Sequence, residues 1–221
     1  MSVHDIARRL PAVPVLRDRC RALATLEAVL APDDPYRRHG FAGRPSPGRE
    51  RAWMDNGAGD SYGIVFSAAG AFVHGFDHES PLSPYAGDGT VWPGVLDAVP
   101  EAFRACVEEL SADGDDVPEV TVCLWREAGD DRWRTGEVEF DEGHGDDPDG
   151  AGHLFGLLVE GTAEAYRDWA EDYHGRPVDL DAVRHIHALR PLTPGVVAAL
   201  NPEVTLDRLR PAVEALGYPS G

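Results

Sequence analysis

Two short apolar runs separated by glycine-containing turns constrain the fold of this chain more than any other feature. The runs are residues 62–66 and 72–76; Gly57-Ala58-Gly59-Asp60 precedes the first run, and Ala68-Ala69-Gly70 lies between the two. Short apolar segments bounded by such turns are typical of antiparallel strands. The pattern therefore predicts a β-hairpin, with Asp77-His78-Glu79 at the end of its second strand.

A second hairpin is expected further along the chain. Residues 120–125 are rich in β-branched and aromatic side chains, Gly129-Asp130-Asp131 supplies a turn, and residues 133–140 are expected to return antiparallel. Between the two hairpins, apolar residues at helical spacing predict a helix over 100–110. Two hairpins predict one mostly antiparallel four-stranded sheet.

Helices are expected on both sides of the strand region. An apolar stripe predicts an amphipathic helix over 16–30, whereas residues 31–52, rich in Pro, Gly and Arg, predict a long loop or arm. After an acidic loop at 141–150, the rest of the chain is expected to be helical. Helix stop and capping signals support this expectation at Gly175, Pro177, Asp179, Thr193 and Thr205.

These elements predict an α+β fold in which a mostly antiparallel four-stranded sheet of two hairpins packs with N-terminal and C-terminal helices. We expect residues 1–52 to form an N-terminal helix plus an Arg/Pro/Gly-rich arm. Residues 53–221 are expected to form a single α+β domain with a helical C-terminal third. A length of 221 residues is sufficient for one substantial core.

The cysteines and the hydropathy of the chain indicate its cellular compartment. Cys20, Cys106 and Cys123 are far apart, and each lies among apolar residues. Such a set predicts reduced, buried thiols. No transmembrane run or signal peptide is visible, so we expect a cytoplasmic protein without a membrane partner.

The charge of the chain is strongly negative and unevenly distributed. Thirty-nine acidic residues and 20 Arg, with no Lys, give a formal charge of −19. The missing Lys indicates the codon bias of a GC-rich bacterial genome, and it excludes chemistry that needs a Schiff-base or P-loop lysine. Residues 1–51 carry +4 and the remaining 170 residues carry −23. An acidic surface repels phosphates, so we expect no nucleic-acid partner and instead a basic protein or cations.

Acidic side chains are the candidate contacts with such a partner. The residues expected to bind it are Asp141, Asp146, Asp147, Asp149, Asp77 and Glu79. An alternative role for the acidic loops is to keep the protein in solution, and the sequence leaves this alternative open.

Asp77-His78-Glu79 is also the densest group of potential metal ligands. Asp60, His74 and Asp88 could approach it if the hairpin brings the Gly57–Asp60 loop back across the strand. Two carboxylates and an imidazole suit a divalent ion. Adjacent residues on an extended chain point in opposite directions, so at most two of the three can reach one ion. The alternative is structural: Asp77 and Ser80 pin the turn into Pro81, and His78 bonds to the backbone. Our preferred prediction is no metal and no cofactor.

Other motifs predict no chemistry. Gly57-Ala58-Gly59 precedes a strand, whereas phosphate-binding glycines follow one, so it is expected to allow positive φ in a tight loop. His185 and His187 point away from each other on a helix. The acids around His144 do not match the ligand pattern of an EF-hand.

The hairpin segment resembles the SUKH superfamily of bacterial immunity proteins. The resemblance lies in Gly57-Ala58-Gly59-Asp60, in the turn at Gly70, and in Asp77-His78-Glu79 at the end of the second strand. It implies an α+β protein without catalytic residues that neutralises a toxin by binding it. We therefore expect a non-enzymatic immunity or accessory protein that binds a basic partner such as a toxin. The alternative is a metal-dependent hydrolase that uses Asp77, His78 and Glu79, with Asp60 or His74 assisting.

Overall fold

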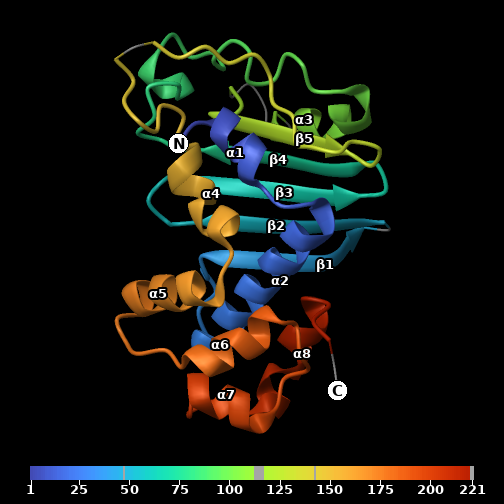
Figure 1. The fold of residues 1–221 in the computed structure, drawn as a ribbon, viewed down its shortest axis with the longest axis vertical. Helices are drawn as coiled ribbons and strands as arrows, with labels where there is room; N and C mark the ends of the chain where they lie inside the picture. Colours follow the sequence, from blue (N-terminus) through green and yellow to red (C-terminus); the bar gives the residue numbers. More distant parts are fainter. Residues whose placement is uncertain (47, 112–116, 142, 220–221) are drawn as a thin grey trace.

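A computed structural model of the chain describes residues 1–46, 48–111, 117–141 and 143–219. None of the described helices is both long and apolar enough to cross a lipid bilayer. The fold is α+β and is built around one antiparallel sheet of five strands (Figure 1).

The strands follow one another across the sheet in chain order, and each pairs antiparallel with the next. They are β1 His39–Ser46, β2 Arg49–Asp55, β3 Ser61–Ser67, β4 Gly70–Phe76 and β5 Val122–Glu127. The hairpin predicted from residues 62–76 is β3 and β4, in which Ile64 lies opposite Val73. This part of the prediction is confirmed.

The sheet has five strands where four were predicted, because β1 and most of β2 occupy the segment expected to be a loop or arm. β1 contains Gly40, Gly43 and Pro45, which are poor strand formers. In β2, Ala52 and Met54 are buried, whereas the alternate residues Arg51 and Trp53 are exposed. Only one face of β2 is apolar, and pairing with β3 holds the segment in a strand.

The predicted return strand over 133–140 is wrong. Only Arg134 pairs with β5, through a single bridge to Trp125, and β5 pairs instead with β4. The carbonyl groups that a strand would use have other partners: His4 Nε2 lies 3.0 Å from the carbonyl oxygen of Val138, and Trp92 donates to that of Glu139. The expected second hairpin is therefore one strand followed by an irregular segment.

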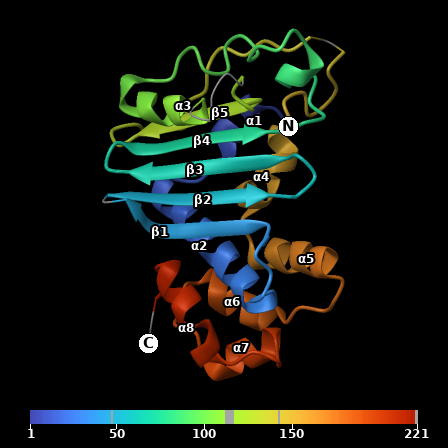
Figure 2. The ribbon, with the colours of Figure 1, turned by 180° about the vertical axis from the view of Figure 1, so that it is seen from behind.

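Helices cover the two faces of the sheet unequally. α1 Val3–Arg9, α2 Val13–Leu30 and α4 Ala151–Glu160 lie on the face seen in Figure 1. A short 3-10 turn, Glu101–Phe103, leads into α3 Arg104–Leu110 on the opposite face, close to β4 and β5; another, Pro84–Ala86, lies earlier in the same long connection. No labelled helix lies over β1 to β3 on that face (Figure 2). On that face, the residue Trp53 is 43% exposed.

The last helices form a layer beyond β1 (Figure 1). They are α5 Ala163–His174, α6 Leu180–His187, α7 Pro194–Leu200 and α8 Leu206–Ala215. The predicted caps are confirmed: the side chains of Asp179, Thr193 and Thr205 each accept a bond from a backbone N–H three residues later. Gly175, in the left-handed region at φ 63°, ends α5 as expected.

The side chains of Arg19 and Glu27 join α2 to α4 and β1. Arg19 donates to the carbonyl groups of Leu158 and Val159 at the end of α4, at 2.6 and 3.1 Å. Glu27, which is fully buried, accepts from the backbone N–H of His39 in β1 at 3.0 Å and lies 2.7 Å from its Nδ1. Burial lowers the pKa of His39, although Glu27 opposes this effect. All three cysteines are buried and unpaired, as predicted.

Candidate functional site

The candidate site lies where β3 begins and β4 ends. Ser61 and Phe76 are paired across the two strands, so Asp60 and Asp77 lie at the same edge of the sheet. The loop before Asp60 turns on Gly57 at φ 70° and Gly59 at φ 109°, which confirms the predicted use of these glycines. The hairpin register therefore brings together acidic residues that are 17 positions apart.

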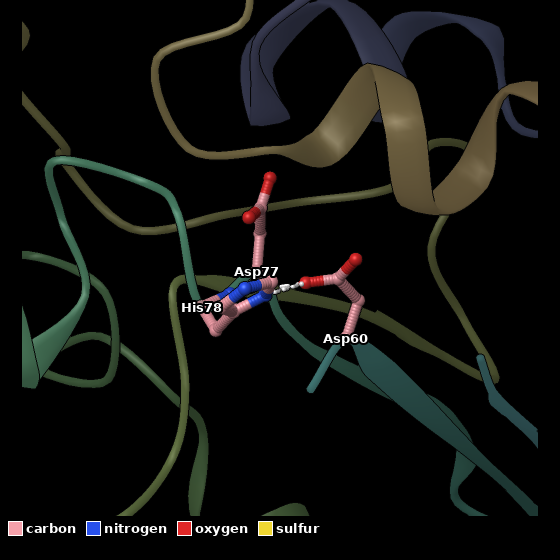
Figure 3. A group of neighbouring side chains, drawn as sticks. All are labelled: Asp60, Asp77 and His78. Carbon is pink, nitrogen blue, oxygen red and sulfur yellow. Dashed lines mark hydrogen bonds and ion pairs between the residues drawn. The ribbon is translucent and has the colours of Figure 1, made fainter. Parts of the chain in front are cut away.

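Asp60 is the centre of this site, although its residue is only 6% exposed. Its Oδ1 accepts from the backbone N–H of His78 at 3.1 Å and lies 2.7 Å from His78 Nδ1 (Figure 3). Its Oδ2 accepts from Asn56 Nδ2 at 2.6 Å and lies 3.3 Å from Nε2 of His153, in the first turn of α4. Asp60 therefore connects three separate segments of the chain.

The electrostatics of the site favour a charged pair. Burial raises the pKa of Asp60, but the hydrogen bonds from His78, Asn56 and His153 outweigh it and leave this pKa below its usual range. The hydrogen bond to Asp60 raises the pKa of His78. The two groups thus favour a carboxylate beside an imidazolium.

Asp77 completes a group that has the composition of a metal site. One potential ligand atom from each of Asp60, Asp77 and His78 lies within 4.8 Å of the other two (Figure 3). Glu79 does not belong to this group: it is exposed, and its backbone N–H donates to Asp77 Oδ1 at 2.9 Å. The structure therefore brings together Asp60, Asp77 and His78 from the ligands considered from the sequence, and leaves Glu79 outside the group.

Two glycines make room for these side chains. A Cβ atom at Gly59 would press against the ring of His78, and one at Gly150 would overlap the carboxylate of Asp77. Both glycines have positive φ. The backbone around the site is thus shaped to hold the imidazole and the carboxylate close to it.

The structural role expected for this turn is present in part. Ser80 donates to the carbonyl group of Pro148 at 2.9 Å and accepts from the N–H of Leu82 at 3.0 Å. Ser80 and Asp77 do pin the turn, as predicted. The ring of His78, however, bonds to the Asp60 carboxylate and not to a backbone group.

Sequence reasoning did not include His153. It lies 93 positions from Asp60 and on a helix, so no local pattern connects the two residues. His74, also considered from the sequence, lies over Gly63 on the sheet face and does not belong to the group. Burial lowers its pKa to about 4. Asp88, considered for the same reason, is exposed and bonds to Thr90.

The acids expected to bind a partner have different environments. Asp141 and Asp146 are exposed, but Asp147 is half-buried and accepts from the N–H groups of Gly152 and His153 at 2.8 Å each. Asp149 is 0% exposed and accepts from the N–H groups of Val3 at 2.8 Å and Ala151 at 3.1 Å.

Asp149 is therefore a capping residue, unavailable to a partner, and this corrects the expectation. Burial raises its pKa to about 6, against the effect of these two bonds. Four further acids of this region, Asp113, Asp115, Asp116 and Glu142, lie outside the described residues.

The remaining histidines considered from the sequence have local partners. Nε2 of His185 lies 2.8 Å from the carbonyl oxygen of Pro191, and Nε2 of His187 lies 2.8 Å from that of Gly161. His144 lies 3.6 Å from Asp141.

Comparison of the chain with protein-family models, curated proteins and solved structures finds no match.

Proposed function

We propose that this protein acts by binding a basic protein partner through its acidic end, defined here as residues 77–150. This segment contains 21 acidic residues and four Arg, a formal charge of −17, while the rest of the chain carries only −2. The described part of the segment lies along β4 and β5 at one end of the molecule, opposite the C-terminal helices (Figures 1 and 2). This concentration of charge at one end carries the proposal.

Much of the charge faces solvent. The side chains of Glu79, Asp88, Glu137, Glu139 and Asp141 are exposed, and none of them forms an ion pair with an Arg of the described chain. Exposed, unneutralised carboxylates produce a field that steers an oppositely charged protein during association. Neutralisation of a basic toxin, the role that the SUKH resemblance suggests, fits such a surface.

The test compares two variants with the same change in charge. The first, Glu137→Gln with Glu139→Gln and Asp141→Asn, neutralises three exposed acids of the acidic end. The second, Glu160→Gln with Asp172→Asn and Glu203→Gln, neutralises three exposed acids elsewhere. The basic protein captured by the unmodified chain is purified, and its association rate is measured at low and high salt.

We expect the first variant to associate about tenfold more slowly at low salt and the second to be almost unchanged, because steering depends on local charge. High salt should reduce the difference between them. Equal rates for all three proteins at low salt, or capture of no basic protein, would contradict the proposal.

The other hypothesis from the sequence is a metal-dependent hydrolase. The convergence of Asp60, Asp77 and His78 favours it, since Asp60 takes the place expected for Glu79. A hydrolase would also have to turn over a substrate in a metal-dependent manner. Loss of that turnover in His78→Ala would support this second candidate.

A further inference from the structure

We propose that Asp60, Asp77 and His78 bind one divalent transition-metal ion of the Zn²⁺ class, and that this ion fastens the acidic end to the sheet. Binding of this ion requires neither the basic partner nor hydrolysis. Two carboxylates and one imidazole form a mixed oxygen and nitrogen donor set. Imidazole suits transition metals such as zinc, whereas magnesium and calcium prefer oxygen ligands alone.

Each of the two carboxylates has one oxygen for the ion and a second oxygen whose hydrogen-bond partner fixes its orientation. Asp77 Oδ1 accepts from the N–H of Glu79, while Oδ2 has no hydrogen bond within the described chain and lies beside Gly150. Asp60 Oδ2 contacts Asn56 and His153, while Oδ1 faces His78 Nδ1 at 2.7 Å. Oriented ligands of this kind, with partners behind them, are characteristic of metal sites in proteins.

The ion would take the place of the proton shared by Asp60 and His78. Zinc bonds to nitrogen and oxygen ligands at about 2.0–2.2 Å. Ligand atoms around one ion are therefore closer together than the 4.8 Å that bounds this group, so binding would draw Asp77 inward. Asn56 and His153 would keep their contacts with the second oxygen of Asp60, and water would fill the remaining positions.

The position of the site gives the ion a structural role. Asp60 precedes β3, Asp77 and His78 follow β4, and His153 lies in α4. Asp77 also lies beside Gly150, the last residue of the acidic end. An ion at this point would join both ends of the acidic segment to the sheet edge, and two positive charges would reduce the repulsion within that segment.

The experiment measures metal stoichiometry and thermal stability of the full chain purified without chelator and titrated with Zn²⁺, or with Co²⁺ as a spectroscopic probe. The test variants are Asp77→Asn and His78→Gln, which each change one ligand. The control combines Asp141→Asn with His144→Gln, because this carboxylate and imidazole also form a pair in the acidic end, 3.6 Å apart. Asp60→Asn is avoided because Asp60 has several structural partners.

We expect one ion per chain in the unmodified and control proteins, with visible Co²⁺ absorption and a Tm rise of about 5–10 °C at a hundredfold excess over Kd. Both test variants should lose at least nine-tenths of the binding and all of the Tm rise. No binding by the unmodified chain, undiminished binding by the test variants, or equal loss in the control would overturn the proposal. The last result would indicate general attraction of cations to acidic loops.

Discussion

Asp60 and His74 lie in different environments, which have opposite effects on their charge. Asp60 has hydrogen-bond donors from three segments, and its carboxylate is favoured despite burial. His74, packed over Gly63, has no hydrogen bond in the described chain, and burial together with nearby Arg51 disfavours its protonated form. A titratable residue that packs without a polar partner makes stability depend on pH.

The prediction for His74 is a loss of stability in acid. Its pKa is lowered to about 4 in the folded protein, whereas an unfolded chain has a histidine pKa of about 6.5. Below about pH 6.5 the unfolded state binds the proton first, so the free energy of unfolding falls as the pH falls toward 4. Between pH 7 and pH 5 this contribution is on the order of 2 kcal/mol.

Urea unfolding of the unmodified chain and of His74→Gln at both pH values measures this contribution. The variant should lose less stability between pH 7 and pH 5, because Gln does not titrate. The control is His185→Gln; in the unmodified chain the His185 ring bonds to the carbonyl oxygen of Pro191. This variant should keep the full pH dependence of the free energy of unfolding. Asp149 titrates in both proteins and cancels in the comparison. Identical pH dependence in all three chains would refute the assignment.

At the scale of the elements, Asp149 holds two helices at once. Its two oxygens accept from Val3 at the start of α1 and from Ala151 at the start of α4. Acidic residues favour helix N-termini, where N–H groups lack partners within the helix. The contact is therefore a shared cap that connects the first helix with one that begins nearly 150 residues later.

Asp149→Ala should destabilise the protein by about 2–4 kcal/mol, because both N–H groups would be left buried without an acceptor. Asp149→Asn should cost less, since its amide retains one acceptor oxygen. Asp146→Ala, at a nearby exposed position, should change the free energy of unfolding by less than about 0.5 kcal/mol. Denaturant unfolding at pH 7 measures all three, and similar values for Asp149→Ala and Asp146→Ala would show that the cap contributes little.

The elements that could be predicted are those whose own residues determine their secondary structure. β3 and β4 have short apolar runs with a turn between them, and the caps Thr193 and Thr205 lie at the residues expected. β1 and β2 could not be predicted because their pairing, and not their composition, keeps them extended. The return strand failed for the opposite reason: residues 133–140 have a suitable composition, but His4 and Trp92 occupy their carbonyl groups.

The same distinction applies to the candidate site. The approach of Asp60 to His78 follows from a hairpin register that the sequence indicates. The approach of His153 depends on how α4 packs against the sheet, and the burial of Asp149 depends on α1. These long-range contacts join residues 93 and 146 positions apart, and no periodicity in the sequence records them.

At the scale of the whole molecule, the acidic end and the C-terminal helices lie at opposite edges of the sheet. The C-terminal helices lie beyond β1, and the acidic end lies along β4 and β5 (Figure 1). Few Arg residues are available to neutralise that end: it contains four against 21 acids. Two of them already pair locally, Arg104 with Glu101 and Arg134 with Asp130. The folded protein therefore confines like charges that the unfolded chain would separate.

Self-repulsion of this kind should make the protein more stable as monovalent salt is added. The Debye length falls from about 30 Å at 0.01 M to about 10 Å at 0.1 M, so the repulsion across the acidic end is screened over this range. Salt also weakens exposed ion pairs, but each contributes only about 0–1 kcal/mol. Thermal unfolding in NaCl with chelator present should therefore show a rising Tm, without a contribution from bound divalent ions.

The charge variants separate local repulsion from a general salt effect. Glu137→Gln with Glu139→Gln and Asp141→Asn should raise Tm at 0.01 M salt by relieving repulsion, and its advantage should shrink at 0.2 M. Glu160→Gln with Asp172→Asn and Glu203→Gln removes the same charge outside the acidic end and should have a smaller effect. A Tm that falls with salt, or equal gains in both variants, would mean that repulsion is not concentrated at the acidic end. In that case, local ion pairs in the folded protein would offset the repulsion between the acidic residues of the acidic end.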